Sequence, residues 1–472
     1  MAYINSYKDQ NWLIPLSVKD MIPNDHICFL VEDFVDSLDF SNFDLVYDGA
    51  GHPAYHPRIP MKILVQGMLS KERSSRKLSN ACRENFVFMY LSEKVQPNFR
   101  TLCRFRKDNA YFIKQAFKET VKLASEHSLV DLNLITQDGS KINAHANRHK
   151  TVKKESLEIL DKIVDKIMEE DIKQDELDME LYGDKEENLT GMHRKDIRKI
   201  VQEYRKRKDK EKIRKTISKA KQEFENNPEL KNVSLTDTDS RMMKNSRGFS
   251  ELSYNAQFSV DSKSQIIIAN DVCQDRHDAN QLIPQIKNVE GNVGKLPKGT
   301  KVALDSGYSS SVNIKFLEDK KLDGYIPSRA QAQEFEGKEQ TLGHDDYEYD
   351  WKKDEIIAKG KRFRYKGFYF RKSNGRKVLI YKSDDGTKKD VPEFFRGRLR
   401  MKEKMEKPES RKTYNLRKVT VEPVIGNIKQ NFGFREFCLR GLKKAEIELN
   451  PVSIAHNLKK IWINSGRLCI VC

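Results

Sequence analysis

The chain has 472 residues, enough for more than one domain, and 33% of them are charged, above the roughly 25% of an ordinary globular chain. The net charge of +17 indicates either a polyanionic partner, most commonly DNA or RNA, or extra lysines on an ordinary protein surface. Seven scattered cysteines exclude a disulfide framework, no apolar run approaches the roughly 20 residues that span a bilayer, and residues 1–11 lack a signal-peptide core. We therefore expect a soluble intracellular protein.

Residues 1–128 are expected to be helical. Helical patterning over residues 74–91 is interrupted at Pro97, and the short segment that follows is basic and includes Arg100 and Arg104. Two short helices around a break, the second of them basic, are typical of a helix-turn-helix-like unit, although most helical pairs bind nothing. This region is therefore a candidate DNA-binding domain, with Arg100 and Arg104 as candidate contacts.

The next long segment, residues 150–232, is dominated by charged side chains. Apolar residues recur in it at the three- and four-residue spacing of amphipathic helices. They are Leu157, Leu160, Val164 and Ile167, then Ile213, Ile217, Ala220 and Phe224. The pattern predicts an inserted antiparallel pair of charged helices, with a break near residues 183–191. The charges are interpreted as a solvated face, without chemistry.

Strand patterning flanks this insertion. Residues 132–138 form a short apolar run, residues 251–260 alternate apolar and polar side chains as in a half-buried strand, and residues 265–272 supply a hairpin partner. After a helix, residues 301–305 form a further strand, and a second helix and a last strand at Tyr325 complete the run. This order predicts an α/β fold with a mixed sheet and helices packed on it. We expect this core to comprise residues 129–149, 233–327 and 401–472.

Residues 328–400 predict a second, β-rich insertion. Basic and aromatic side chains interleave there, which is typical of surfaces that follow single nucleic-acid strands; a β-hairpin with basic outer positions is the alternative. The aromatic residues are Phe363, Tyr365, Phe368, Tyr369 and Phe370. Helix returns near Arg411, and Asn450 followed by Pro451 is typical of the cap and first position of a last helix.

Two acids end predicted strands. Asp138 is followed by Gly139, and Asp305 is followed by Ser306 and Gly307. Functional groups gather at the carboxyl ends of strands in open α/β sheets, and small residues allow a backbone or ligand to come close. Two neighbouring carboxylates repel unless a cation lies between them, and Mg²⁺ prefers such oxygen ligands. The alternative is that each Asp only caps a turn or a helix.

A third acid is expected from a helix over residues 414–432. Glu422, Gly426 and Lys429 lie along one edge of its apolar stripe, so that Glu422 can reach the two aspartates, Gly426 leaves room for DNA and Lys429 can meet a phosphate. A solvated Glu is the alternative, because the pattern alone does not choose among several glutamates. The stripe consists of Val421, Ile425, Ile428 and Phe432, and the other glutamates are Glu409, Glu436 and Glu448.

Several ordered blocks of the sequence resemble those of bacterial insertion-sequence transposases of the DDE type, over nearly the whole length. In the N-terminal third they are Pro57-Arg58-Ile59-Pro60, Ser75-Arg76-Lys77-Leu78 and Thr101-Leu102-Cys103-Arg104-Phe105-Arg106. Further along they are Asp138-Gly139-Ser140, Asp239-Ser240-Arg241-Met242-Met243-Lys244, Tyr254-Asn255-Ala256-Gln257 and Asp305-Ser306-Gly307-Tyr308.

A last block resembles the tyrosine-arginine-glutamate-lysine signature of these enzymes. Its members are Tyr414, Arg417, Glu422 and Lys429, and the resemblance implies that Tyr414, Arg417 and Lys429 contact DNA. Four residues separate Arg417 from Glu422 where the signature has three, and Lys418 holds the expected place. This departure bears on the role of Arg417; the six-residue gap from Glu422 to Lys429 is kept.

The resemblance also implies a fold and an activity. A ribonuclease H-like core would follow a helical N-terminal domain, and Asp138, Asp305 and Glu422 would be catalytic acids that hold two Mg²⁺ or Mn²⁺ ions. The enzyme would bind the inverted-repeat ends of double-stranded DNA as a homodimer in a synaptic complex, nick them and join them to target DNA. Its place would be the bacterial cytoplasm, on the nucleoid. Two alternatives are a catalytically inactive DNA-binding relative and a structure-selective nuclease that cuts without joining.

Overall fold

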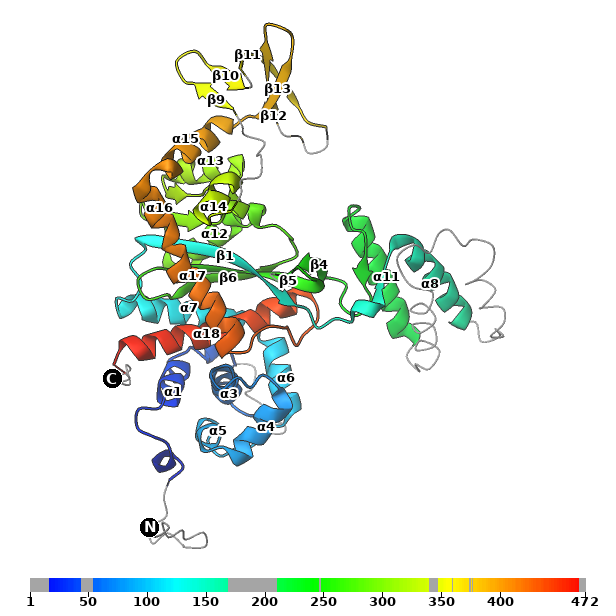
Figure 1. The fold of residues 1–472 in the computed structure, drawn as a ribbon. Coiled ribbons are helices and arrows are strands. Elements are labelled where there is room, and N and C mark those ends of the chain that lie inside the picture. Colours follow the sequence, from blue (N-terminus) through cyan, green and yellow to red (C-terminus); the bar gives the residue numbers. More distant parts are fainter. Residues whose placement is uncertain are drawn as a thin grey trace, which may run out of the picture. The chain divides into compact units, whose positions relative to one another are not determined.

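The chain forms two compact units. We call them the helical unit (Met1–Leu129, Asn431–Gly433 and Asn450–Cys472) and the sheet unit (Val130–Gln430 and Phe434–Leu449). In the computed structural model (Figure 1), the described residues are 17–43, 54–168, 210–245, 248–338, 347–358, 360–372, 375 and 377–466.

The helical unit consists of short helices around a buried apolar centre, as the sequence predicts for this region. Ten of the twelve residues of α3 (Arg58–Leu69) are buried, and its one lysine, Lys62, is satisfied by an ion pair with Asp36 at 2.8 Å. Asn85 and Asn98 cap the next helices by accepting hydrogen bonds from backbone N–H groups. The other elements are η1 (Lys19–Met21), α1 (Cys28–Asp36), α4 (Ser75–Glu84), α5 (Phe86–Leu91), α6 (Phe99–Asp108) and α7 (Ala110–Glu126).

A six-stranded mixed sheet forms the centre of the sheet unit, as predicted. Its order is β4-β5-β1-β7-β8, with β6 also paired to β5; β1, β7 and β8 run parallel, and β5 runs antiparallel to β1. The strands are β1 (Leu134–Asn143), β4 (Arg241–Lys244), β5 (Ser250–Asp261), β6 (Ile267–Cys273), β7 (Lys301–Leu304) and β8 (Asp323–Tyr325). The connecting helices are η4 (Asp278–Asn280), α12 (Leu282–Val293), η5 (Ser306–Tyr308) and α13 (Ser311–Lys320).

Strand β1 does not end at Asp138, which corrects the sequence prediction. It continues to Asn143, because Asp138 to Asn143 keep pairing with the antiparallel strand β5. Its parallel pairing with β7 does stop at Gln137, opposite Leu304. Asp138 is therefore a mid-strand residue at the place where its parallel neighbour ends.

Strand β5 is buried on both faces, although its alternation predicted a half-buried strand. Tyr254, Ala256 and Phe258 are buried, but so are the intervening polar residues Asn255 and Gln257. The polar positions are buried because they hydrogen-bond to other polar side chains, among them Gln137 of β1 and Asp278 of η4.

The described part of the charged insertion consists of α8 (Lys154–Met168) and α11 (Lys210–Asn226). An ion pair joins Lys221 to Asp161, and Leu157, Leu160, Ile213, Ile217, Ala220 and Phe224 are buried. A short antiparallel pair, β2 (Thr151–Val152) with β3 (Val233–Ser234), lies at the base of the insertion. The side chains of Val164 and Ile167 and the break expected near residues 183–191 lie outside the described residues.

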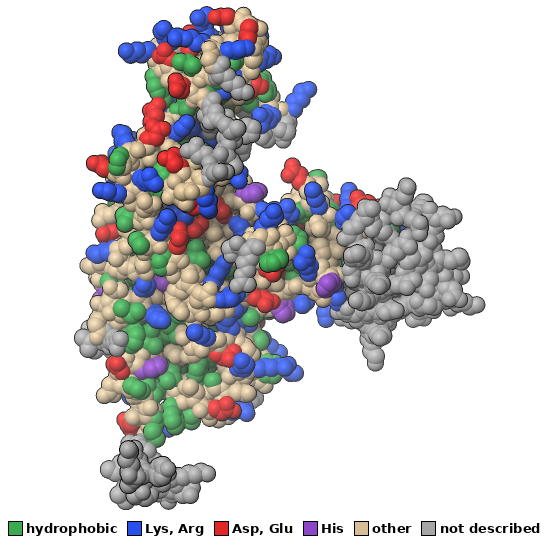
Figure 2. Space-filling model, viewed as in Figure 1, with side chains coloured by type: hydrophobic (Ala, Val, Ile, Leu, Met, Phe, Trp, Pro, Cys, Tyr) green, Lys and Arg blue, Asp and Glu red, His purple; other side chains and the backbone are tan. Residues whose placement is uncertain are grey.

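The second insertion is a five-stranded antiparallel sheet, more extensive than a single hairpin. Tyr381, Ile356 and Phe395 are at the centre of its small core. Lys and Arg side chains are prominent over this sheet in Figure 2. Its strands, in the order β13-β12-β11-β10-β9, are β9 (Glu348–Asp350), β10 (Glu355–Ala358), β11 (Lys361–Phe370), β12 (Lys377–Ser383) and β13 (Lys388–Pro392), flanked by α14 (Arg329–Phe335) and α15 (Phe395–Glu406).

The last helix, α18 (Leu442–Asn464), begins eight residues before the predicted cap at Asn450, so this prediction was wrong. Carboxylates of the sheet unit cap it instead: Asp239 Oδ2 accepts from Leu442 N at 2.9 Å, and Asp237 Oδ1 accepts from Gly441 N at 3.1 Å. Pro451 therefore lies inside the helix. The segment before it consists of α16 (Pro408–Asn415), α17 (Arg417–Gly426) and the π-helical turn η6 (Asn427–Asn431).

Candidate active site

The two predicted aspartates lie side by side at one place of the sheet. Gln137 of β1 pairs with Leu304 of β7, and Asp138 and Asp305 are the next residues of each chain segment. Each carboxylate accepts a hydrogen bond from the following backbone N–H, at 2.8 Å for Asp138 and 2.7 Å for Asp305. These contacts fix one oxygen of each side chain.

Helix α17 brings the third acid to the same place. It packs against β1 (Figure 1) and carries both Arg417 and Glu422. The Arg417 guanidinium reaches all three acids: Asp138 Oδ2 at 3.2 Å, Glu422 Oε1 at 3.3 Å and Asp305 Oδ1 at 4.0 Å. One cationic side chain therefore lies among the three carboxylates that the sequence singled out.

Burial and charge oppose each other at this cluster. Burial raises the pKa of Asp138 to about 6, together with the negative charges of Asp305 and Asp278, while Arg417 lowers it. Burial lowers the pKa of Arg417, but the surrounding acids outweigh burial and raise it above its ordinary value. Asp305 and Glu422 keep 45% and 44% of their side-chain surface exposed, so the cluster is open to solvent on their side.

A layer of hydrogen-bonded polar side chains lies behind the acids, and sequence reasoning missed it. Asp278 Oδ1 accepts from Asn255 Nδ2 and from Gln257 Nε2, both at 2.7 Å, and lies 3.4 Å from Lys141 Nζ. The Tyr308 hydroxyl donates to Gln257 Oε1 at 2.6 Å. The alternating polar residues of β5 are the signal in the sequence, but alternation alone predicts that they face solvent.

The glycine after Asp138 is required by this layer. A Cβ at Gly139 would lie 2.2 Å from Gln257 Nε2, 2.3 Å from Asp278 Oδ1 and 2.8 Å from Asn255 Oδ1. The side chains of the layer thus cover the backbone at Gly139, which lets Asp278 approach Asp138.

The other signature residues, Tyr414, Arg417 and Lys429, lie near the acids. Leu416 separates α16 from α17, so Arg417 begins the second helix and is buried, while Lys418 is exposed. The Tyr414 ring lies 5.6 Å from the Arg417 guanidinium. Lys429 Nζ donates to the Lys141 carbonyl at 3.1 Å, and burial lowers the pKa of Lys429.

The sequence predicts that Gly426 leaves room for DNA beside Glu422, and the structure has open space at Gly426. A Cβ added at Gly426 would meet nothing within 4 Å. Of the predicted apolar stripe, Val421, Ile428 and Phe432 are buried, whereas Ile425 is only half-buried. The half-burial of Ile425 agrees with an edge that faces open space.

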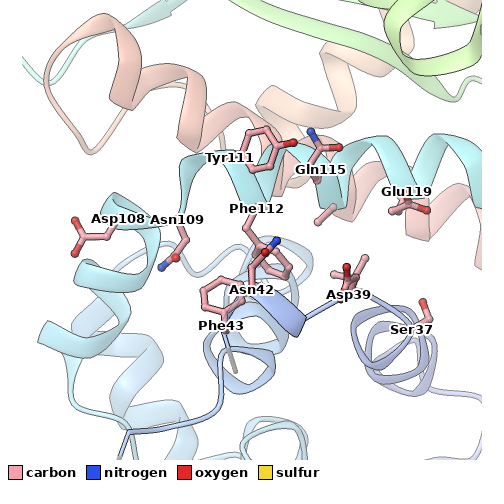
Figure 3. Close-up of a pocket in the computed structure, with 12 residues that line it drawn as sticks. Ser37, Asp39, Asn42, Phe43, Asp108, Asn109, Tyr111, Phe112, Gln115 and Glu119 are labelled. Carbon is pink, nitrogen blue, oxygen red and sulfur yellow. The ribbon is translucent and has the colours of Figure 1, made fainter. Parts of the chain in front are cut away.

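The predicted DNA contacts of the helical unit are both exposed on α6. Arg100 and Arg104 point away from the buried Leu102 and Phe105 of the same helix. A pocket of about 680 Å³ in this unit (Figure 3) has a different character, because Asp39, Asp108 and Glu119 line it. These three carboxylates give the pocket a negative charge, which disfavours phosphate.

Two protein-family comparisons match the chain. Residues 16–108 match a transposase domain (DUF772), and residues 383–462 match the transposase DDE domain. These matches identify the chain as an insertion-sequence transposase of the DDE type. The second match includes Arg417, Glu422 and Lys429, whereas Asp138 and Asp305 lie outside both. No curated protein matches the chain.

The DDE domain implies an enzyme that cleaves and transfers DNA, and transposases with this domain generally use a divalent metal. The donor chemistry of the cluster fits such an ion, since three carboxylates supply hard oxygen ligands. In the part of the chain that the structure describes, however, no group of three or more His, Cys, Asp or Glu is arranged to hold a metal ion. Among these acids lies the guanidinium of Arg417 instead. No helix among the described residues is long and apolar enough to cross a membrane.

Proposed function

We propose that this transposase cleaves the inverted-repeat ends of an insertion sequence and joins them to target DNA, with Asp138, Asp305 and Glu422 as its catalytic acids. One observation supports this choice above others. The three acids come from two strands and a helix far apart in the sequence, yet all three lie within 4.0 Å of the Arg417 guanidinium. The sheet with its central antiparallel β5 is compatible with a ribonuclease H-like core.

In this proposal Asp138, Asp305 and Glu422 supply the oxygen ligands of two Mg²⁺ or Mn²⁺ ions. When bound, such ions lower the pKa of an attacking water or 3′ hydroxyl and stabilise the leaving oxygen of the phosphoryl transfer. Carboxylates that are already fixed in place suit metal binding and catalysis, because the side chains need to move little when the reaction occurs. The hydrogen bonds from the backbone after Asp138 and Asp305 support this rigidity.

The remaining site residues position the DNA. The space beside Gly426 admits the backbone of a strand next to Glu422. Lys429, on the same helical edge, offers its ammonium group to a phosphate, and Tyr414 and Arg417, which precede Glu422 along the chain, contact the DNA as well. Arg100 and Arg104 on α6 contact the duplex outside the site. Two ends are held by two copies of the protein, in the bacterial cytoplasm on the nucleoid.

The test replaces each acid by its amide: Asp138→Asn, Asp305→Asn and Glu422→Gln. Cleavage of an element end in Mg²⁺ is expected to fall at least roughly 10³-fold in each variant, the order seen when one member of a catalytic unit is removed, while DNA binding changes little. Glu409→Gln is the matched control, because Glu409 is exposed on the preceding helix. A variant with full cleavage would remove that residue from the site.

A second assay separates transposition from simple cutting. A precut end with a 3′ hydroxyl is incubated with the unmodified protein, Mg²⁺ and a target duplex, and joined product is measured. We expect joining that depends on the same three acids. Cleavage without joining would mean a structure-selective nuclease, and binding without either reaction would mean an inactive DNA-binding relative.

A further inference from the structure

Arg417 lies at the centre of the acidic cluster. Only 10% of its side-chain surface is exposed, and it is the one residue that pairs with all three acids among the described residues. Without it, Asp138, Asp305 and Glu422 would be three negative charges held close together in a partly buried place, which is costly unless a positive charge compensates them. The guanidinium supplies that positive charge.

The guanidinium uses the oxygens that a metal would need. Mg²⁺ binds oxygen ligands at roughly 2.0–2.1 Å and tolerates little distortion. Asp138 Oδ2 and Glu422 Oε1 already face Arg417 at 3.2 and 3.3 Å, and Asp138 Oδ1 accepts the Gly139 N–H. A cation and the guanidinium therefore cannot share the space between these carboxylates.

Arg417 interacts with the three acids mainly through charge, and some of its N–H groups do not form hydrogen bonds with the described residues. Its Nε and NH1 atoms are buried and, within the described part of the chain, have no acceptor in hydrogen-bond geometry. A buried donor without an acceptor is unfavourable, which lowers the free-energy cost of moving the side chain elsewhere. Arg417 is the first residue of α17, and the ring of Tyr414 in the preceding helix lies 5.6 Å from its guanidinium.

We propose that Arg417 is a positioning residue that holds the three carboxylates together before metal arrives, and that metal enters only when the Arg417 side chain leaves. This inference rests on the proposed function, since it concerns the same acids. It makes metal and guanidinium competitors for one site. A DNA phosphate offers the departing guanidinium an equivalent anionic partner, so DNA favours the open arrangement.

The competition can be measured without catalysis. Binding of Mn²⁺ to the whole chain, without DNA, is followed by electron paramagnetic resonance of the free ion. A ligand that needs a minor state binds more weakly by the fraction of that state, so a 10% population of the open arrangement predicts about tenfold tighter Mn²⁺ binding in Arg417→Gln. Lys418→Gln removes the same charge one residue away from an exposed position and should bind like the unmodified protein.

A second measurement uses the unmodified protein, in case Arg417→Gln does not fold. An arginine-specific dicarbonyl reagent is applied with and without saturating Mn²⁺, and labelling is read by peptide mass spectrometry. Labelling of Arg417 is expected to rise with Mn²⁺, whereas the exposed Arg411 serves as the internal reference. Unchanged Arg417 labelling at saturating Mn²⁺ overturns the proposal.

The outcomes distinguish this inference from the proposed function. If the unmodified protein binds Mn²⁺, Asp305→Asn loses it, and Arg417→Gln binds no more tightly, the acids hold metal but Arg417 does not compete with it. If neither the unmodified protein nor Arg417→Gln binds Mn²⁺, the metal-dependent function and this inference fall together. Equal tightening in Lys418→Gln would point to a general charge effect and also overturn the role of Arg417.

Discussion

At the scale of single residues, the structure leaves no space for a side chain at Gly139. Gly139→Ala would push its Cβ into Gln257, Asp278 and Asn255, at separations of 2.2 to 2.8 Å, and these side chains hydrogen-bond one another. We expect a destabilisation of about 1–3 kcal/mol, the usual cost of overpacking, measured from the denaturant midpoint.

The control for this prediction is a helical glycine with space around it. A Cβ at Gly291 of α12 meets nothing within 4 Å. Gly291→Ala should therefore leave stability unchanged or raise it by up to about 1 kcal/mol, from helix propensity. Equal behaviour of the two variants would mean that the polar layer rearranges without cost around residue 139.

Sequence reasoning reached some residues of the candidate site and not others, for a physical reason. Asp138 and Asp305 each follow an apolar run and precede a glycine within two residues, so local pattern was sufficient to single them out. Glu422 needed the resemblance, because solvated glutamates share its pattern. Asp278 carries no local signal: its importance arises from side chains of β5 and β1 that only the folded sheet brings to it.

At the scale of elements, the beginning of α18 depends on residues distant in sequence. Asp237 Oδ1 accepts from the Tyr254 hydroxyl at 2.8 Å and from Gly441 N at 3.1 Å, and Asp237 is buried. Asp237→Ala leaves both donors without this acceptor, so we expect a loss of about 2–5 kcal/mol in unfolding free energy.

Asp237→Asn is the matched variant, since its amide oxygen can still accept from Tyr254 and Gly441. Its cost should be clearly smaller, about 1 kcal/mol, in the same denaturant titration. Combining Asp237→Ala with Tyr254→Phe should cost less than the sum of the single changes, because the second change removes one orphaned donor. Simple additivity would argue against the hydrogen bond between Tyr254 and Asp237.

The same contacts explain which elements the sequence could predict. The helices of the N-terminal region and the mixed sheet follow from periodicity within each segment. The beginning of α18 could not be predicted from periodicity, because the residues that cap it, Asp237 and Asp239, lie about two hundred residues earlier in the chain. The extension of β1 past Asp138 likewise depends on its pairing with β5. Long-range partners decide where these elements begin and end.

At the scale of the whole molecule, the excess of Lys and Arg predicts how DNA binding responds to salt. The net charge is +17, and Figure 2 shows Lys and Arg intermingled with Asp and Glu on the face in view. If phosphate contacts dominate, the logarithm of the binding constant falls linearly with the logarithm of salt concentration, with a slope of about −0.9 per neutralised phosphate. A flat response would argue against DNA as the partner.

The change in this salt dependence can be predicted for two residues of α6. Arg100 and Arg104 are exposed, and replacing both by Gln should make the slope shallower by up to about 1.8 if each neutralises one phosphate. The control replaces the exposed Lys295 and Lys298 by Gln, because these precede β7 and lie at the end of that strand opposite Asp305. Salt titrations of an element end by fluorescence anisotropy measure both slopes. The same slope in both double variants would move the duplex contacts away from α6.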